Sequence, residues 1–189
     1  MTGEDRYQPP FGPELPTTRS AVAFAEQRHD GQRRRYDRAP FIRHPLEVAT
    51  LLHDAGAGDE LVAAGVLHDV VEKASVSPGE LEDRFGPRVA GLVCAVSENP
   101  AIAEYSARKA ALREQVAYAG EDALMLFAAD KLSKVRELHD PRAKAPARRI
   151  THYRRSLELL KALLPDYRLT RELDSELEQV LALRALAVG

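Results

Sequence analysis

The chain has 189 residues, which suits one domain with a sizeable core, and its 44% hydrophobic and 30% charged residues are typical of a globular protein. A net charge of −2 argues against nucleic acid or an anionic membrane surface as partners, because both favour basic proteins. The one cysteine, Cys94, excludes an intrachain disulfide and predicts a reducing, cytoplasmic location, and no apolar run approaches the length of a membrane span.

Residues 1–17 are predicted to form a flexible tail ahead of one helical domain that spans residues 18–189. The first sixteen residues, MTGEDRYQPPFGPELP, contain four prolines, which are typical of extended linkers. They lack the basic start and the apolar middle of a signal peptide. The first helix is therefore expected to begin at a capping residue, Thr17 or Thr18.

The first half of the domain is predicted to consist of helices separated by short polar segments. The first helix should end near Gly31, and the basic loop GQRRRYDRAPF follows it. Pro45 suits the first turn of a second helix, and Asp59 can cap the helix that contains the stretch VLHDVVEKA. The segment SPGE, from Ser77 to Glu80, matches a capping box with a proline at the first helical position.

The second half is predicted to be helical too, after a break near Gly86. A strongly apolar helix begins at Asp122 and carries one acid in its middle, within LFAADKL. Further helices are predicted over residues 104–119, 146–163 and 170–186, the last of them peripheral. No alternating strand pattern of useful length is present, so the fold class is predicted to be all-α, a multi-helix bundle.

Four ionisable residues stand on helices that otherwise read as apolar. His44 lies at a helix start, His68 and Asp69 interrupt VLHDVVEKA, and Asp130 lies within LFAADKL. Helix interiors avoid ionisable groups unless these are paired or bind a metal. Two imidazoles and two carboxylates from three helices would form a nitrogen and oxygen ligand set that suits manganese, iron or zinc.

Glu72 follows His68 by four residues and is therefore expected on the same helical face. A divalent ion lowers the pKa of bound water and polarises a phosphoryl oxygen, and Glu72 could move the proton of that water. The residues alone leave a structural alternative open, in which the His-Asp pair is a hydrogen-bonded core group and Asp130 is paired with an arginine. The remaining histidines are expected to be surface or capping groups: His29, His53, His139 and His152.

Five segments, taken in order, resemble the metal-dependent phosphohydrolases of the HD-domain superfamily. The likeness is greatest to the alarmone (guanosine tetra- and pentaphosphate) hydrolases of the Rel/Spo type. The segments are AFAEQRHDGQRRR, PFIRHPLEVATLL, LVAAGVLHDVVEKA, SPGELEDRFGPRVAGLV and LMLFAADKLSKVREL, and together they cover about residues 20–140. The resemblance implies an HD-domain helical bundle that removes the 3′-pyrophosphate of guanosine 3′,5′-bis(diphosphate).

The resemblance also implies a role for individual residues. Glu72 falls on the catalytic glutamate, and Arg34 and Arg35 fall on an Arg-Lys pair that flanks the nucleotide base. The metal ligands of the family fall on His44, His68, Asp69 and Asp130. Manganese is the leading candidate for the metal, with zinc and iron as alternatives, and the partner is a small anionic nucleotide or phosphate ester.

Two lysines depart from the family's pattern. Lys73 replaces the acid that follows the catalytic glutamate; a charged lysine there cannot accept a proton but could hold a phosphate oxygen. Lys134 replaces an asparagine that holds the nucleotide sugar and phosphate, and Ser133 replaces a histidine. These changes keep three alternatives open: a catalytically impaired metal- or nucleotide-binding protein, a phosphohydrolase for another nucleotide or phosphate ester, and a helical interaction domain. A homo-oligomer is also left open.

Overall fold

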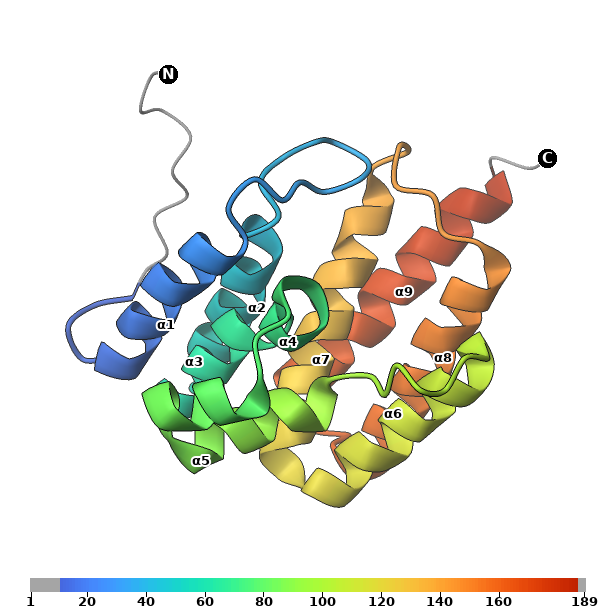
Figure 1. Ribbon diagram of the computed structural model, residues 1–189. Coiled ribbons are helices and arrows are strands. Elements are labelled where there is room, and N and C mark those ends of the chain that lie inside the picture. Colours follow the sequence, from blue (N-terminus) through green and yellow to red (C-terminus); the bar gives the residue numbers. More distant parts are fainter. Residues whose placement is uncertain (1–10, 187–189) are drawn as a thin grey trace.

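The computed structural model describes residues 11–186 and confirms the all-α prediction (Figure 1). Within that range the only bridge between extended segments joins Arg33 and Pro40. No helix in the range combines the length and the apolar character that a membrane crossing demands. The elements are α1 (Pro16–Arg28), α2 (Arg43–Asp54), α3 (Asp59–Leu67), α4 (Val70–Ala74), α5 (Pro78–Val96), α6 (Tyr105–Ala119), α7 (Glu121–Arg136), the 3₁₀ helix η1 (Glu137–His139), α8 (Ala147–Leu163) and α9 (Arg168–Leu186).

Helix α7 forms the centre of the bundle (Figure 1) and packs against α2, α3, α5, α6, α8 and α9. Its large apolar side chains, among them Leu126, Phe127 and Leu132, are fully buried. Most residues of α7 from Ala123 to Val135 are buried, as expected of a helix enclosed by other helices. Its position therefore forces the polar residues in its middle, including Asp130, into the interior of the protein.

Two local signals in the sequence are confirmed in α5. The Ser77 hydroxyl oxygen accepts a hydrogen bond from the Glu80 backbone N–H at 3.1 Å, as a capping residue does. Gly86 has φ 84° and ψ 164°, a conformation that L side chains rarely adopt, and it divides the helix into two segments. The break near Gly86 turns the second segment, which carries Val89, toward α7.

The predicted capping role of Asp59 is wrong. Gly58 occupies the N-cap position of α3, and Asp59 is the first residue of that helix. The Asp59 carboxylate instead accepts hydrogen bonds from the backbone N–H groups of Thr17 and Thr18, at 2.9 and 2.8 Å. It thereby caps α1 from a neighbouring helix and joins α1 to α3, a pairing that local sequence could not reveal.

Helix α9, expected at the periphery, packs on α7 and α8 and contributes Leu169, Leu173, Leu177 and Val180 to the core. Most of the predicted tail, residues 1–10, lies outside the described residues. Within the described part of that segment, Leu15 is buried.

Two irregular segments lie at the end of the bundle where α7 ends (Figure 1): the loop between α1 and α2, and the segment between η1 and α8. The loop between α1 and α2 lies beside the C-terminal end of α7, where Arg34 Nη1 is 3.7 Å from Glu137 Oε1. The loop is also attached to α4, because the Gln32 side chain donates a hydrogen bond to the Lys73 carbonyl oxygen at 2.9 Å. These contacts place the basic loop over the segment that carries the His-Asp pair.

Replacing Asp59 with alanine should lower the free energy of unfolding by about 1–2 kcal/mol, because two first-turn N–H groups of α1 lose their acceptor. Burial raises the pKa of Asp59, but the hydrogen bonds from Thr17 and Thr18 outweigh it and hold the pKa below its usual value. The stabilisation is therefore present above the unfolded-state pKa and is lost as pH falls through the lower folded-state pKa. Urea titrations at pH 7 and pH 3 measure this. The exposed Asp54→Ala serves as control, and an equal loss in both variants would contradict the assignment.

Candidate metal centre

The four predicted ligands come from α2, α7 and a break between α3 and α4. His44 is the second residue of α2, and Asp130 lies in the middle of α7. The helix expected to run through VLHDVVEKA is interrupted: α3 ends at Leu67, and Asp69 has φ −99° and ψ −4° before α4 begins. Both members of the His-Asp pair thus lie at the break, which lets their adjacent side chains reach one centre.

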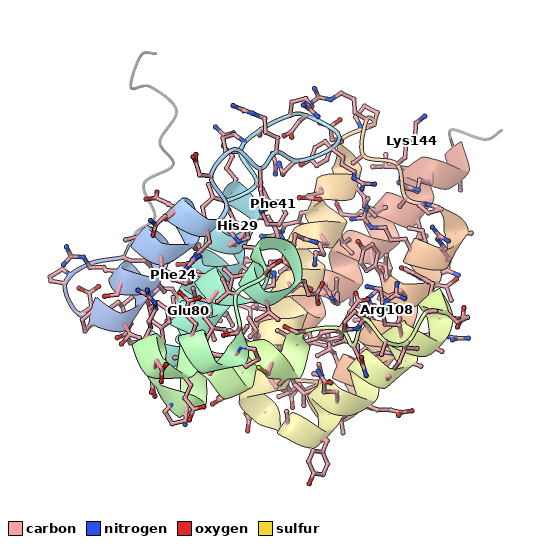
Figure 2. All side chains as sticks on the ribbon, in the orientation of Figure 1. Phe24, His29, Phe41, Glu80, Arg108 and Lys144 are labelled. Atoms are coloured by element: carbon pink, nitrogen blue, oxygen red, sulfur yellow. The ribbon has the colours of Figure 1, made fainter. Side chains whose placement is uncertain are left out.

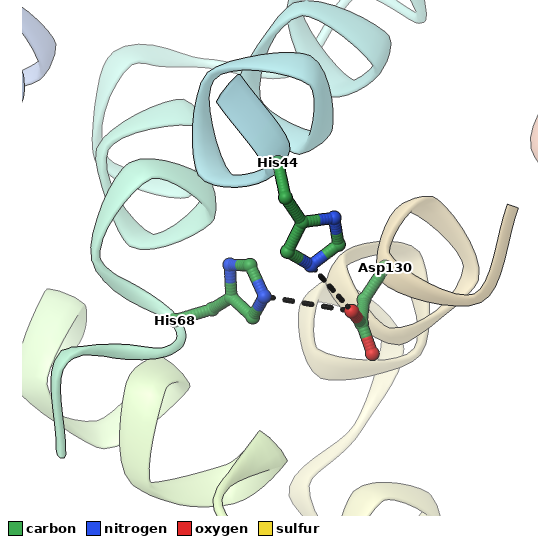
Figure 3. A group of neighbouring side chains, drawn as sticks. All are labelled: His44, His68 and Asp130. Atoms are coloured by element: carbon green, nitrogen blue, oxygen red, sulfur yellow. Dashed lines mark ion pairs between the residues drawn. The ribbon is translucent and has the colours of Figure 1, made fainter. Parts of the chain in front are cut away.

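The ligand atoms converge (Figure 3). His44 Nε2 is 3.2 Å and His68 Nε2 is 3.4 Å from Asp130 Oδ1. Asp69 Oδ2 lies 3.7 Å from the first of these nitrogens and 3.5 Å from the second. All four residues are at most 5% exposed. The structure therefore brings together the four residues that the sequence singled out.

Three of the inward-facing atoms make no hydrogen bond although they are buried: His44 Nε2, His68 Nε2 and Asp69 Oδ2. Buried polar atoms nearly always have partners, so three unpartnered atoms beside the Asp130 carboxylate indicate the ligands of a cation. The opposite ring nitrogens are engaged. His44 Nδ1 lies 2.9 Å from Ser133 Oγ, and His68 Nδ1 donates to the Gly65 carbonyl oxygen at 2.8 Å. Such bonds keep the Nε2 lone pairs directed at the centre.

The charge states suit a cation site. Burial lowers the pKa of His44 to about 4, with the charges of Lys134 and His68 acting in the same direction, so this imidazole is neutral at pH 7. Burial alone would raise the pKa of Asp69 and of Asp130, but neighbouring positive charges outweigh it and hold both pKa values below the usual range. Burial lowers the pKa of His68, but Asp69 and Asp130 outweigh it and raise that pKa. The centre thus offers ionised carboxylates and, at His44, a neutral imidazole, the forms that bind metals.

Two lysines contact the Asp130 carboxylate. Lys134 Nζ lies 2.6 Å from Oδ1, the oxygen that faces the histidines, and Lys131 forms an ion pair with Oδ2. Burial lowers the pKa of Lys131 to about 8. Burial also acts to lower the pKa of Lys134, but Asp130 and Asp69 outweigh it and raise that pKa above its usual value. A charged Lys134 therefore competes with any cation for Oδ1.

Two cavities meet at the centre. The loop-side cavity, about 540 Å³, lies under the α1–α2 loop and is bordered by His44, Phe41 and Glu137. The α6-side cavity, about 600 Å³, extends from His68 and Asp130 toward α6 and α8. The residues that line both are Arg35, Asp69, Lys73, Lys134 and Arg149. A ligand with more than one anionic group could therefore occupy both sides of the centre at once.

The remaining predicted site residues line these cavities in different ways. Arg34 is held by Asp37 and its guanidinium lies 4.9 Å from the centre of the Tyr36 ring, whereas Arg35 is exposed. Lys73 Nζ lies 5.7 Å from the centre of the Phe41 ring. Glu72 lines the α6-side cavity and accepts a hydrogen bond from the Glu98 backbone N–H at 2.7 Å.

Sequence reasoning missed the contribution of α6 and α8 to the α6-side cavity. Arg149 and Tyr153 of α8 line it, with Arg149 Nε donating to the tyrosine oxygen at 2.6 Å. Arg108 and Lys109 of α6 line it too, paired with Glu98. Their basic character was visible in the sequence, but nothing local showed which cations face the cavity.

His29 and His152 are not surface groups, because they are 3% and 5% exposed, and His29 occupies the C-cap position of α1. His29 is covered by Phe41 of the returning loop, with ring centroids 4.9 Å apart, and the two residues lie close together in Figure 2. His152 is covered by α6, whose Arg113 Nη1 lies 3.2 Å from its Nδ1. By contrast, His139 is partly exposed and pairs with Glu176 at 2.7 Å.

Comparison with known proteins gives a consistent result. The sequence profile described as HD domain matches residues 21–159. A human protein named guanosine-3′,5′-bis(diphosphate) 3′-pyrophosphohydrolase MESH1 is 35% identical over 132 residues, which cover 68% of this chain and 73% of that protein. A protein of Aquifex aeolicus (strain VF5) named guanosine-3′,5′-bis(diphosphate) 3′-pyrophosphohydrolase is 34% identical over 120 residues. These residues cover 62% of this chain and 17% of that protein, so the chain spans about a sixth of that relative.

Two solved structures are similar. One is described as a metazoan ortholog of SpoT that hydrolyzes ppGpp, with a TM-score of 0.76, 27% identity and coverage of 86% of this chain and 94% of that one. The other is a protein from Listeria monocytogenes EGD-e with a TM-score of 0.66 and 27% identity, covering 75% of this chain and 98% of that one.

Replacing Lys134 with asparagine should tighten the binding of Mn²⁺ by roughly tenfold, because a positive charge next to a ligand oxygen disfavours a second cation. Isothermal titration of metal-free protein with Mn²⁺ measures this. Lys161→Asn, which removes an exposed lysine paired with Asp174, is the control and should leave the affinity unchanged. Unchanged or weaker binding by Lys134→Asn would show that the ammonium does not compete with the metal.

Proposed function

The chain belongs to the HD domain family, and on that premise we propose that it is a metal-dependent phosphohydrolase acting on guanosine 3′,5′-bis(diphosphate) as a 3′-pyrophosphohydrolase. The observation that carries the proposal is the meeting of three unpartnered ligand atoms with the Asp130 carboxylate between two cation-lined cavities. The names of the human and Aquifex relatives support the choice of substrate.

In this proposal the metal is held by His44, His68, Asp69 and Asp130. Imidazole nitrogens mixed with carboxylate oxygens suit manganese, zinc or iron, and manganese is the ion proposed. When bound, the divalent cation supplies an activated water and polarises a phosphoryl oxygen. The location proposed is the cytoplasm, which fits a free Cys94 and a nucleotide substrate.

Glu72 is proposed to accept the proton of the attacking water. The carboxylate lies in the α6-side cavity together with His68 and Asp69. The backbone N–H of Glu98 holds its Oε1, and among residues 11–186 no hydrogen bond or ion pair involves Oε2, which is therefore available as the base.

The cations around the cavities are proposed to bind the substrate. Arg34, held by Asp37 and stacked near Tyr36, offers a flat surface for the nucleotide base on the loop side. Arg35, Lys73 and, once released from Asp130, Lys134 are positioned where the two cavities join, and they would hold the phosphate oxygens during cleavage.

A second candidate function is a metal- or nucleotide-binding protein with impaired catalysis. The observation that favours it is the pair of lysines, Lys73 and Lys134, at positions where the related hydrolases have an acid and an asparagine. A cation at position 73 cannot share the proton transfer proposed for Glu72, and Lys134 already contacts Asp130.

Asp69→Ala should abolish both Mn²⁺ binding and pyrophosphate release, because it removes a ligand whose oxygen has no other partner. Elemental analysis and a pyrophosphate assay with guanosine 3′,5′-bis(diphosphate) measure the two effects, and circular dichroism checks the fold. Asp54→Ala, an exposed acid, is the matched control. Metal-dependent hydrolysis by Asp69→Ala at the wild-type rate would reject the assignment.

Replacing Lys73 with aspartate separates the two candidate functions. If the wild-type protein is inactive, the variant should gain pyrophosphate release by a factor of roughly 10²–10⁴, the range expected of acid–base assistance. Initial rates of both proteins with Mn²⁺ provide the measurement. If the wild-type protein already turns over the substrate, the second candidate function, a binding protein with impaired catalysis, is ruled out. The same assay with other nucleotides and phosphate esters defines the substrate.

A further inference from the structure

A third cavity lies between α6 and α8, away from the proposed metal ligands. It has a volume of about 260 Å³, and we call it the basic side pocket. Tyr105, Lys109 and His152 line both this pocket and the α6-side cavity, so the two are neighbours. None of the roles assigned above uses the residues that line only the side pocket.

The lining of the basic side pocket carries an uncompensated positive charge. Four cations line it and no acidic residue does: Lys109, Arg113, Arg148 and Arg155. Lys109 is paired with Glu98, whereas the three arginines form no ion pair with a carboxylate among residues 11–186. Arg148 lies 5.0 Å from the centre of the Tyr105 ring. Neighbouring positive charges that outnumber the acids near them repel one another, so the pocket is prepared for an anion.

His152 adds a buried donor that lacks an acceptor. A guanidinium can only donate, so His152 Nδ1 must accept the hydrogen bond from Arg113 Nη1 at 3.2 Å, and the ring proton resides on Nε2. Nε2 is buried and has no partner. Burial, together with the charges of Lys131, Lys109 and Arg113, lowers the pKa of His152 to about 2, so the ring stays neutral. A neutral histidine that lines the pocket together with several cations leaves the positive charge of the arginines available to an oxyanion.

We propose that the basic side pocket is a second oxyanion site, which binds a phosphate or pyrophosphate group through its arginines beside His152. The anion could be the distal polyphosphate of a nucleotide whose other end lies at the metal centre, since the two cavities are neighbours, or a separate phosphate compound. Assigning the source rests on the proposed function, whereas the existence of the site does not.

The test of the site uses metal-free protein titrated with inorganic pyrophosphate and followed by the ring-nitrogen resonances of His152. Arg155→Gln removes a cation that lines the side pocket but not the α6-side cavity. Arg154→Gln removes the preceding residue of α8, which is exposed and lines neither. The His152 signal should shift in the wild-type protein, and Arg155→Gln should weaken that response by about fivefold or more, while Arg154→Gln leaves it unchanged.

Two results would overturn the site: a His152 resonance that does not respond to pyrophosphate, or an equal affinity in both arginine variants. Because this titration requires neither metal nor turnover, it can fail or succeed independently of the proposed hydrolase activity. Both replaced arginines are exposed surface residues, so their loss should leave the fold intact, and circular dichroism verifies this.

The source of the anion is distinguished by kinetics with two substrates. Guanosine 3′,5′-bis(diphosphate) carries a second diphosphate, and guanosine 3′-diphosphate with a free 5′-hydroxyl does not. If the substrate fills the pocket, Arg155→Gln raises KM for the first substrate by about fivefold and leaves the second unchanged. If a separate anion fills the pocket, Arg155→Gln leaves KM unchanged for both substrates. In that case added phosphate changes the rate of the wild-type protein but not that of Arg155→Gln.

Discussion

The ionised carboxylate of Asp130, buried at the centre of the bundle, is the constraint on which the structure depends. An isolated charge at that depth would be very costly, so its surroundings must supply compensating positive charge. Lys131 contributes an ammonium group at Oδ2 and Lys134 contributes one at Oδ1. The Nε2 atoms of the two histidines lie near Oδ1 as well. Helix α7, which carries the carboxylate, packs against α2, α3, α5, α6, α8 and α9. This packing encloses the charged groups in the interior of the bundle.

The break between α3 and α4 is the second requirement of the centre. In a continuous helix, adjacent residues differ in direction by about 100°, so His68 and Asp69 could not both face one point. The bend at Asp69 brings the second carboxylate within 3.5 Å of the His68 ring. The same bend begins α4, which carries Glu72 and Lys73 to the border of the cavities. One local departure from helical geometry thus arranges ligands and cavity-lining residues together.

Positive charge is distributed from the centre outward along α6, α7 and α8. Near the centre it competes with a metal, as Lys134 does at Asp130, and farther away it lines cavities without acids, as around Arg155. The net charge of −2 does not reveal this concentration of cations, because most acidic residues lie outside the cavities. A tract of cations over neighbouring cavities favours elongated ligands with several anionic groups over small neutral ones, independently of which reaction follows.

The sequence by itself determined the helical class, the capping box at Ser77 and the four ligand candidates, because helix periodicity and capping are local and the motif segments fall in order. Tertiary structure alone decided that Asp59 caps another helix and that His152 is buried. These outcomes depend on which helices become neighbours after folding. Residues that are 41 or more positions apart, or that lie on opposite sides of a helix break, come into contact only when the helices pack. The pattern of apolar residues along one helix does not specify which side chains of a neighbouring helix it will contact.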